Sequence, residues 1–133
     1  MLSAGDCLLI ETNRDRFGYI KSHLFVIVLE PQGANRIVII VNIESFRSPK
    51  QDQTTILEPG VHEFVIRHSY VNYARARLVP IDELEMLIKS GDAKVKSPLD
   101  SNTFKKVCDG ILKSKFTPYE VRDVYENYLF SQL

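Results

Sequence analysis

The stretch HLFVIVLEPQGANRIVIIVNIES, residues 23–45, decides the fold of this 133-residue chain. Two runs within it, residues 23–30 and residues 36–44, are apolar at nearly every position, which is typical of central strands covered on both faces. The intervening PQGAN supplies proline, glycine and asparagine, which fix or permit turn dihedrals. The stretch therefore predicts a β-hairpin at the centre of a sheet.

Shorter strands are expected around this hairpin. The candidates, each bounded by turn or loop residues, are residues 5–11, 54–57, 61–67 and 73–79. Two polar connections complete this half of the chain, a charged one over residues 12–22 and a surface loop over residues 45–53. Several short strands joined by tight turns indicate a small, strongly curved antiparallel barrel or an open sandwich.

The hydrophobic period changes at Pro80. The segment that begins there has acids in its first turn and Gly91 just beyond its last, which is typical of a helix. A second helix is expected from a cap at Asp100 or Ser101, and a third from TPYE, residues 117–120, which matches a capping box.

The fold class is therefore α+β. A small antiparallel β-barrel over residues 1–79 is expected to be followed by a helical extension over residues 80–133 that packs on it, within a single domain of residues 1–133.

Composition narrows the function classes. Seventeen basic residues balance seventeen acidic ones, so binding to nucleic acid would need a local patch rather than a net field. The longest apolar run, residues 24–29, is far shorter than the roughly twenty residues of a membrane span. The N-terminus lacks the features of a signal peptide. Cys7 and Cys108 are favoured as reduced thiols, with a disulfide as the alternative. We expect a cytoplasmic protein without membrane contact.

Common catalytic motifs are absent from the sequence. The six glycines are isolated, no HExxH or paired Cys/His spacing occurs, and no serine lies in a GxSxG context. We therefore expect no cofactor and no metal ion, and chemistry that uses only side-chain acids, bases and cations.

The richest polar stretch is HEFVIRHSYVNYARARLV, residues 62–79. Within the strand expected over residues 73–79, the two-residue period places Tyr73, Arg75 and Arg77 on one face. Such a face suits a phosphate backbone. The alternative is a solvated face whose arginines pair with acids of the C-terminal helices.

The order of the β half resembles the PemK/Kid/MazF family of toxin ribonucleases, which share an SH3-like barrel with the gyrase poison CcdB. The matching features are Gly5-Asp6 before an apolar strand, a charged loop, the pair HLFVIVLE and RIVIIVNIES, and the polar strand end VIRHS. They cover residues 5–79. The resemblance implies an SH3-like barrel, a homodimer, and neutralisation by a cognate antitoxin protein.

The family's functional positions fall on substituted residues in this chain. His23 stands near the place of an arginine that contacts the scissile phosphate, and the proline that follows that arginine is missing. Glu44-Ser45 replaces a threonine-serine pair. Arg67-His68-Ser69 lies where the Kid branch has an arginine and an aspartate.

Metal-independent RNA cleavage needs a base, an acid and a cation for the phosphorane oxygens. Imidazole can serve either proton role, and guanidinium matches phosphate oxygens. The predicted catalytic residues are His23, Glu44, Arg67 and His68. The predicted RNA-binding residues are Ser45, Ser69, Tyr70, Tyr73, Arg75 and Arg77, with the two tyrosines stacking on bases at roughly 1–3 kcal/mol each.

Three functions follow as hypotheses. The first is a PemK-like toxin that cleaves single-stranded RNA. The second is an inactive barrel that binds RNA or a protein partner, and the third is a CcdB-like poison that acts by protein contact.

Overall fold

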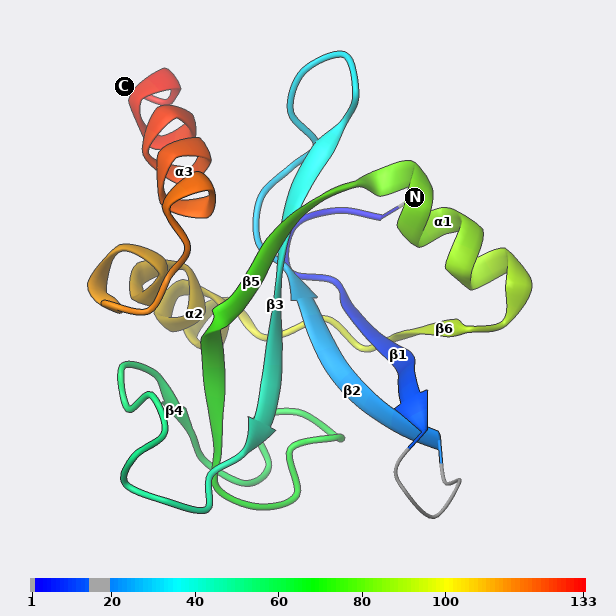
Figure 1. Cartoon of the computed structure of the whole chain (residues 1–133), viewed down its shortest axis with the longest axis vertical. Coiled ribbons are helices and arrows are strands. Elements are labelled where there is room, and N and C mark those ends of the chain that lie inside the picture. Colours follow the sequence, from blue (N-terminus) through cyan, green and yellow to red (C-terminus); the bar gives the residue numbers. More distant parts are fainter. Residues whose placement is uncertain (1, 15–19) are drawn as a thin grey trace.

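A single antiparallel sheet of six strands organises the computed structural model, which describes residues 2–14 and 20–133. The strands are β1 (Cys7–Arg14), β2 (Ile20–Ile27), β3 (Ile37–Ser45), β4 (Ile56–Leu57), β5 (Ser69–Pro80) and β6 (Ala93–Lys96), in the order β4-β5-β3-β2-β1-β6. The helices are α1 (Ile81–Ser90), α2 (Ser101–Lys113) and α3 (Tyr119–Ser131). The sheet curls into a half-barrel, so the α+β class is confirmed (Figure 1).

The predicted central hairpin is confirmed. β2 and β3 pair antiparallel, with Leu24 opposite Ile43 and Ile27 opposite Ile40. Both faces of β3 are covered, because its alternate residues enter two separate hydrophobic clusters. The charged connection is shorter than residues 12–22, since β1 and β2 extend into it. Residues 15–19 of that connection lie outside the described residues.

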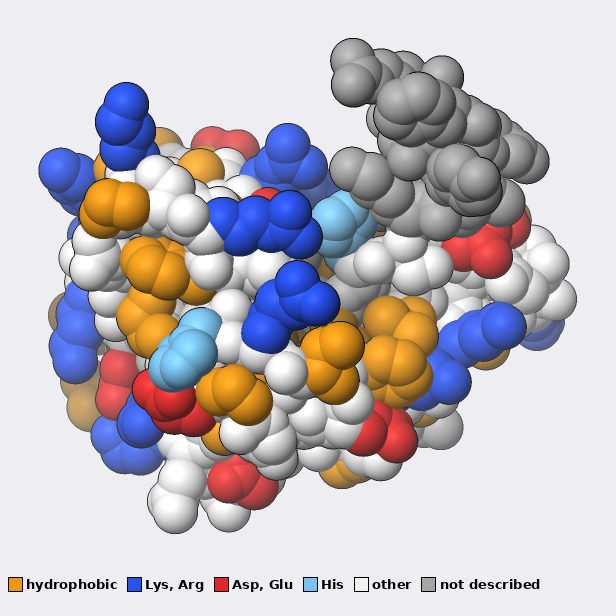
Figure 2. Space-filling model, turned by 90° about the horizontal axis from the view of Figure 1, so that it is seen from below, with side chains coloured by type: hydrophobic (Ala, Val, Ile, Leu, Met, Phe, Trp, Pro, Cys, Tyr) orange, Lys and Arg blue, Asp and Glu red, His pale blue; other side chains and the backbone are white. Residues whose placement is uncertain are grey.

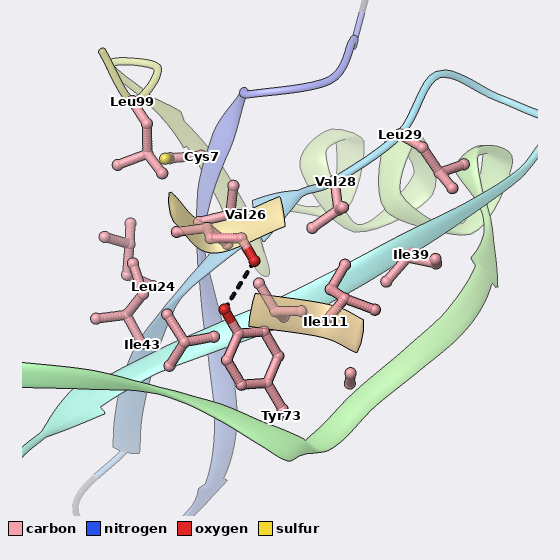
Figure 3. Close-up of a cluster of buried hydrophobic side chains, with 14 of the residues drawn as sticks. Cys7, Leu24, Val26, Val28, Leu29, Ile39, Ile43, Tyr73, Leu99 and Ile111 are labelled. Atoms are coloured by element: carbon pink, nitrogen blue, oxygen red, sulfur yellow. Dashed lines mark hydrogen bonds between the residues drawn. The ribbon is translucent and has the colours of Figure 1, made fainter. Parts of the chain in front are cut away.

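The first cluster lies between the sheet and the two C-terminal helices. Val107 and Ile111 of α2 and Val121 of α3 are fully buried against β-strand side chains. Figure 3 shows Ile111 among the side chains of the sheet. Tyr73 is also fully buried there. Its hydroxyl donates to the carbonyl oxygen of Val107 at 2.7 Å and lies 2.8 Å from Thr55 Oγ1.

The second cluster lies on the opposite face, under α1. Helix α1 buries Ile81 and Leu84 there and ends at Gly91, whose φ of 86° turns the chain back towards the sheet. The chain then forms β6, which pairs with β1. Residues 80–133 therefore contain, besides the three expected helices, a short strand that was not expected and that completes one edge of the sheet.

The strand expected over residues 73–79 is part of the longer β5, which contains a bulge. Asn42 of β3 pairs with Asn72, but Ile40, two residues earlier, pairs with Arg77. The extra residues on the β5 side break the two-residue alternation of side chains.

This bulge separates Tyr73 from the arginines that follow it. Tyr73 enters the first cluster, whereas Arg75 and Arg77 line a cavity on the α1 face with Asn42. The predicted shared face of Tyr73, Arg75 and Arg77 is therefore wrong.

The strand expected over residues 61–67 is also wrong, because the segment forms turns. His62 is buried, and its Nε2–H donates to the carbonyl oxygen of Ser97 at 2.6 Å while its Nδ1 accepts from the Phe64 N–H at 3.1 Å. These side chain–backbone bonds compete with a strand ladder.

The predicted helix starts have mixed outcomes. Asp100 caps α2 by accepting from the Thr103 N–H at 3.1 Å, as expected. The capping box is wrong: Pro118 occupies the N-cap position of α3, and the Thr117 hydroxyl donates to the Ile111 carbonyl oxygen at 2.7 Å.

Cys7 and Cys108 are free thiols. Among the described residues, none of the helices has the length and apolar character required to cross a membrane.

Candidate functional site

The α1-facing surface of the sheet becomes polar beyond the second cluster. Along β3, Asn42 and Glu44 continue the face that starts with apolar residues. Asn42 pairs with Asn72 and Glu44 with Tyr70 of β5. The β2–β3 register, continued by one pair, sets His23 beside Glu44. Three neighbouring strands therefore supply one polar patch.

Glu44 is the centre of a hydrogen-bond network in this patch. Its Oε2 accepts from Asn42 Nδ2 at 2.8 Å and from Asn72 Nδ2 at 2.7 Å. The Tyr70 hydroxyl donates to Oε1 at 3.4 Å. The carboxylate is thus held in one orientation by two amides and a phenol.

The network controls the protonation of Glu44. Partial burial by itself would raise the pKa of this carboxyl group, but the donors Asn72 and Asn42 and the nearby charges of Arg75 and His23 outweigh that effect. The net result is a pKa below the ordinary value of 4.5. Glu44 is therefore a carboxylate at neutral pH.

Tyr70 responds in the opposite direction. Burial and then the charge of Glu44 raise the pKa of its phenol. Tyr70 is therefore a neutral hydrogen-bond donor in this site rather than a proton acceptor.

Asn42 has an unsatisfied acceptor. The residue is 2% exposed, and among the described residues its Oδ1 is the buried side-chain atom that has no hydrogen-bond partner. The amide cannot be turned to satisfy Oδ1, because Nδ2 is committed to Glu44. A buried acceptor without a partner costs about 1–3 kcal/mol. A ligand that places a hydrogen-bond donor next to Asn42 Oδ1 would satisfy this acceptor.

Two cavities flank the patch. One, of about 500 Å³, is lined by residues that include Glu44 and Arg47 and also Ile43 of the first cluster, so it opens towards that side of the sheet. The other, also about 500 Å³, lies on the α1 face and is lined by residues that include Arg75 and Arg77. His23 lines both, so the two cavities lie next to each other. Each has the volume of a typical small-ligand pocket.

Cations surround these cavities. Arg47, Arg75 and Arg77 are exposed and form no salt bridge with a described side chain. Arg36, by contrast, forms a salt bridge with Asp82 of α1, in which Nη1 and Oδ1 are 2.9 Å apart. The alternative in which Arg75 and Arg77 pair with acids of the C-terminal helices is therefore wrong. Figure 2 shows basic side chains and imidazoles gathered among apolar ones at this end of the molecule.

Most of the predicted site residues come together. Those that line the two cavities or bond to Glu44 are His23, Glu44, Ser45, Ser69, Tyr70, Arg75 and Arg77.

Three predicted residues do not join this group. Arg67 and His68 are exposed and line neither cavity, and His68 Nδ1 lies 3.3 Å from the carboxylate of Glu58. The prediction that Tyr73 stacks on RNA bases is wrong, because its side chain is 0% exposed and held in the first cluster.

The predictions missed Asn42, Asn72, Arg47 and Gln51. The signal for Asn42 was an amide within the run RIVIIVNIES, where a strand covered on both faces requires the amide to have buried partners. Arg47 and Gln51 belong to a loop whose position depends on its own hydrogen bonds, such as Gln51 Oε1 accepting from the Arg47 N–H at 2.6 Å.

Among the side chains that the structure describes, no group of three or more potential ligands is placed to hold a metal ion. Comparisons of the chain with protein-family models, with curated proteins and with solved structures found no match.

Proposed function

We propose that this chain is a PemK-like toxin that cleaves single-stranded RNA without a metal ion. The observation that supports this most is the placement of His23 beside Glu44, with Arg75 and Arg77 lining a cavity that His23 also lines. The site combines an imidazole, a carboxylate and free guanidinium groups, which together meet the needs of phosphodiester cleavage.

The lowered pKa of Glu44 supports the following proton roles. Glu44, a carboxylate at neutral pH, takes the proton of the ribose 2′-hydroxyl. The 2′-oxygen then forms a bond to phosphorus as the bond from phosphorus to the 5′-oxygen breaks. The imidazolium of His23 gives its proton to that leaving oxygen, so the products are a 2′,3′-cyclic phosphate and a 5′-hydroxyl.

Arg75 and Arg77 stabilise the pentacovalent phosphorane. Their planar forks donate to its non-bridging oxygens, which carry more negative charge than in the substrate. Arg67 and His68 have no role in this assignment because they line neither cavity.

Cleavage of a panel of single-stranded RNAs tests this proposal. We expect the wild type to yield products with 2′,3′-cyclic phosphate ends, identified by mass spectrometry. His23→Ala and Glu44→Gln should each lower the rate by about 100-fold or more. His68→Ala is the matched control and should leave the rate unchanged. No cleavage by the wild type, or equal losses in the His68 and His23 variants, would contradict the assignment.

A second function is an RNA-binding barrel without cleavage. The specific observation in its favour is that Arg67 and His68, at family positions, lie outside the cavities. Binding of RNA with a steep dependence on salt and without products would indicate this function. Growth arrest with intact RNA would instead indicate a CcdB-like poison.

A cognate antitoxin and a homodimer belong to the toxin proposal through the resemblance alone, and the cytoplasmic location is the expectation from composition. Co-purification of the chain with the product of a short neighbouring open reading frame would test the antitoxin.

A further inference from the structure

Two adjacent cavities lie towards the C-terminal helices. One is lined by residues that include Lys50, Gln51 and Phe116. The other shares these three residues and also reaches Lys113 and Lys115. We call these two cavities the basic groove; Gln51 also lines the cavity beside Glu44.

Hydrogen bonds fix the position of the Phe116 backbone in the basic groove. It lies between α2 and α3, is 48% exposed, and borders two consecutive cavities. Its N–H donates to Ser114 Oγ at 3.1 Å, and the hydroxyl of the buried Ser114 donates to Asp52 Oδ2 at 2.6 Å. The backbone that carries this aromatic ring is therefore held in place before any ligand binds.

The charges around Phe116 favour an anion. Lys50, Lys113 and Lys115 are exposed and form no salt bridge with a described residue. Lys115 Nζ lies 5.3 Å from the centroid of the Phe116 ring. The acid at this end, Asp52, is 8% exposed and already accepts hydrogen bonds from its neighbours, so it opposes an anion little.

The geometry points to a second nucleotide subsite at Phe116, distinct from the proposed cleavage site. A base stacks on the Phe116 ring, and the flanking phosphates contact Lys50, Lys113 and Lys115. This inference rests on the proposed function, because it takes single-stranded RNA as the occupant of the basic groove. An aromatic ring among unpaired cations favours RNA over an acidic peptide, since every nucleotide supplies both a base to stack and a phosphate to contact the cations.

The subsite also gives the C-terminal part of the chain a role. Phe116 and two of the three lysines belong to residues 80–133, outside the part that resembles the toxin family. The subsite would therefore add affinity for RNA strands long enough to extend past the cleavage site.

Fluorescence anisotropy with labelled 2′-O-methyl oligouridylates tests the subsite, because a blocked 2′-oxygen prevents cleavage. For a strand of about ten nucleotides, Phe116→Ala should weaken binding by between about 5-fold and 150-fold, the range for one stacked base. Phe116→Trp should retain the affinity, and a dinucleotide should not distinguish the variants. Phe130→Ala removes another exposed aromatic ring, 76% exposed and outside the groove, and is the matched control.

A second variant covers the case in which Phe116→Ala folds poorly. Lys50→Gln should reduce the slope of log affinity against log salt concentration by about 0.7, the value for one phosphate contact on a single strand.

The outcomes separate the two proposals. Wild-type cleavage with no effect of Phe116→Ala on the longer strand overturns the subsite and leaves the proposed function standing. Binding that depends on Phe116 without any cleavage supports the subsite and removes the nuclease. No binding of the longer strand by the wild type overturns both. If Phe116→Ala weakens the binding of a polyglutamate peptide by the same factor as the binding of RNA, the nucleotide subsite is also overturned.

Discussion

Glu44 links the stability of the sheet to its proposed chemistry at the scale of a single residue. Two amides on neighbouring positions bind its carboxylate, and two cations lie close to it. The same contacts that lower its pKa keep it ionised, as the proposed proton transfer requires, and stabilise the pairing of β3 with β5.

The lowered pKa of Glu44 predicts a specific acid sensitivity. Because its pKa in the folded chain lies below 4.5, the stabilisation is present above about pH 4.5 and is lost as the pH falls through the folded value. We expect the free energy of unfolding to decrease less between pH 7 and pH 4 in Glu44→Gln than in the wild type. Urea denaturation at both pH values measures this.

The control for this comparison is Glu126→Gln. Glu126 is also a glutamate, but it is exposed on α3, lies outside the polar patch and forms no salt bridge with a described residue. An equal decrease in the wild type and in Glu44→Gln would contradict the attribution.

At the scale of elements, the bulge in β5 determines on which face of the sheet the side chains of this strand lie. It sends Tyr73 to the helices of the first cluster and the arginines after it to the α1 face. The Tyr73 hydroxyl reaches α2 at the Val107 carbonyl oxygen, next to Gly110. The close packing of α2 against the sheet therefore depends on a glycine at position 110.

Gly110→Ala should destabilise the fold. A Cβ atom there would overlap the Tyr73 hydroxyl and would lie 2.5 Å from Thr55 Oγ1. Overpacking of this kind costs about 1–3 kcal/mol, which outweighs the roughly 1 kcal/mol that alanine gains over glycine in a helix. We expect a net loss of up to about 2 kcal/mol, measured by urea denaturation.

Asn102→Ala in the exposed part of the same helix is the control, and its effect should stay within about 0.5 kcal/mol. A Gly110 variant as stable as the wild type would show that α2 can shift away from Tyr73.

At the scale of the whole molecule, the two hydrophobic clusters hold the chain on both faces of one curled sheet. The first cluster joins the N-terminal strand to the C-terminal helices and contains or contacts both thiols, Cys7 and Cys108. Burial raises the pKa of Cys7 to about 12 and that of Cys108 to about 11.

Both thiols should therefore resist alkylation while the chain is folded. Only the thiolate reacts, so the raised pKa lowers the reactive fraction of Cys7 about 1000-fold from that of a thiol of pKa 9. With iodoacetamide at pH 8, mass spectrometry should find the native chain unlabelled and the urea-unfolded chain labelled twice. Rapid labelling of the native chain would show that the first cluster opens locally.

The candidate site was only partly predictable. His23 and Glu44 flank the predicted hairpin, so their approximate proximity was available from residues 23–45. Their exact register was not available, because the turn bridge Gln32–Ile37 and the ladder pair Ile27–Ile40 differ in offset by two residues. The exclusion of Arg67 and His68 was not available, since it depends on turns that the buried His62 stabilises through Ser97, a residue distant in sequence.

Local patterns by themselves determined the central hairpin, the α+β class and the cap of α2 at Asp100, because period, turn chemistry and capping act within a few residues. Only the tertiary structure decided the bulge of β5, the pairing of β6 with β1 and the groove that leads to Phe116. Each of these depends on contacts between segments far apart in the chain, where packing and hydrogen bonding outweigh local preference.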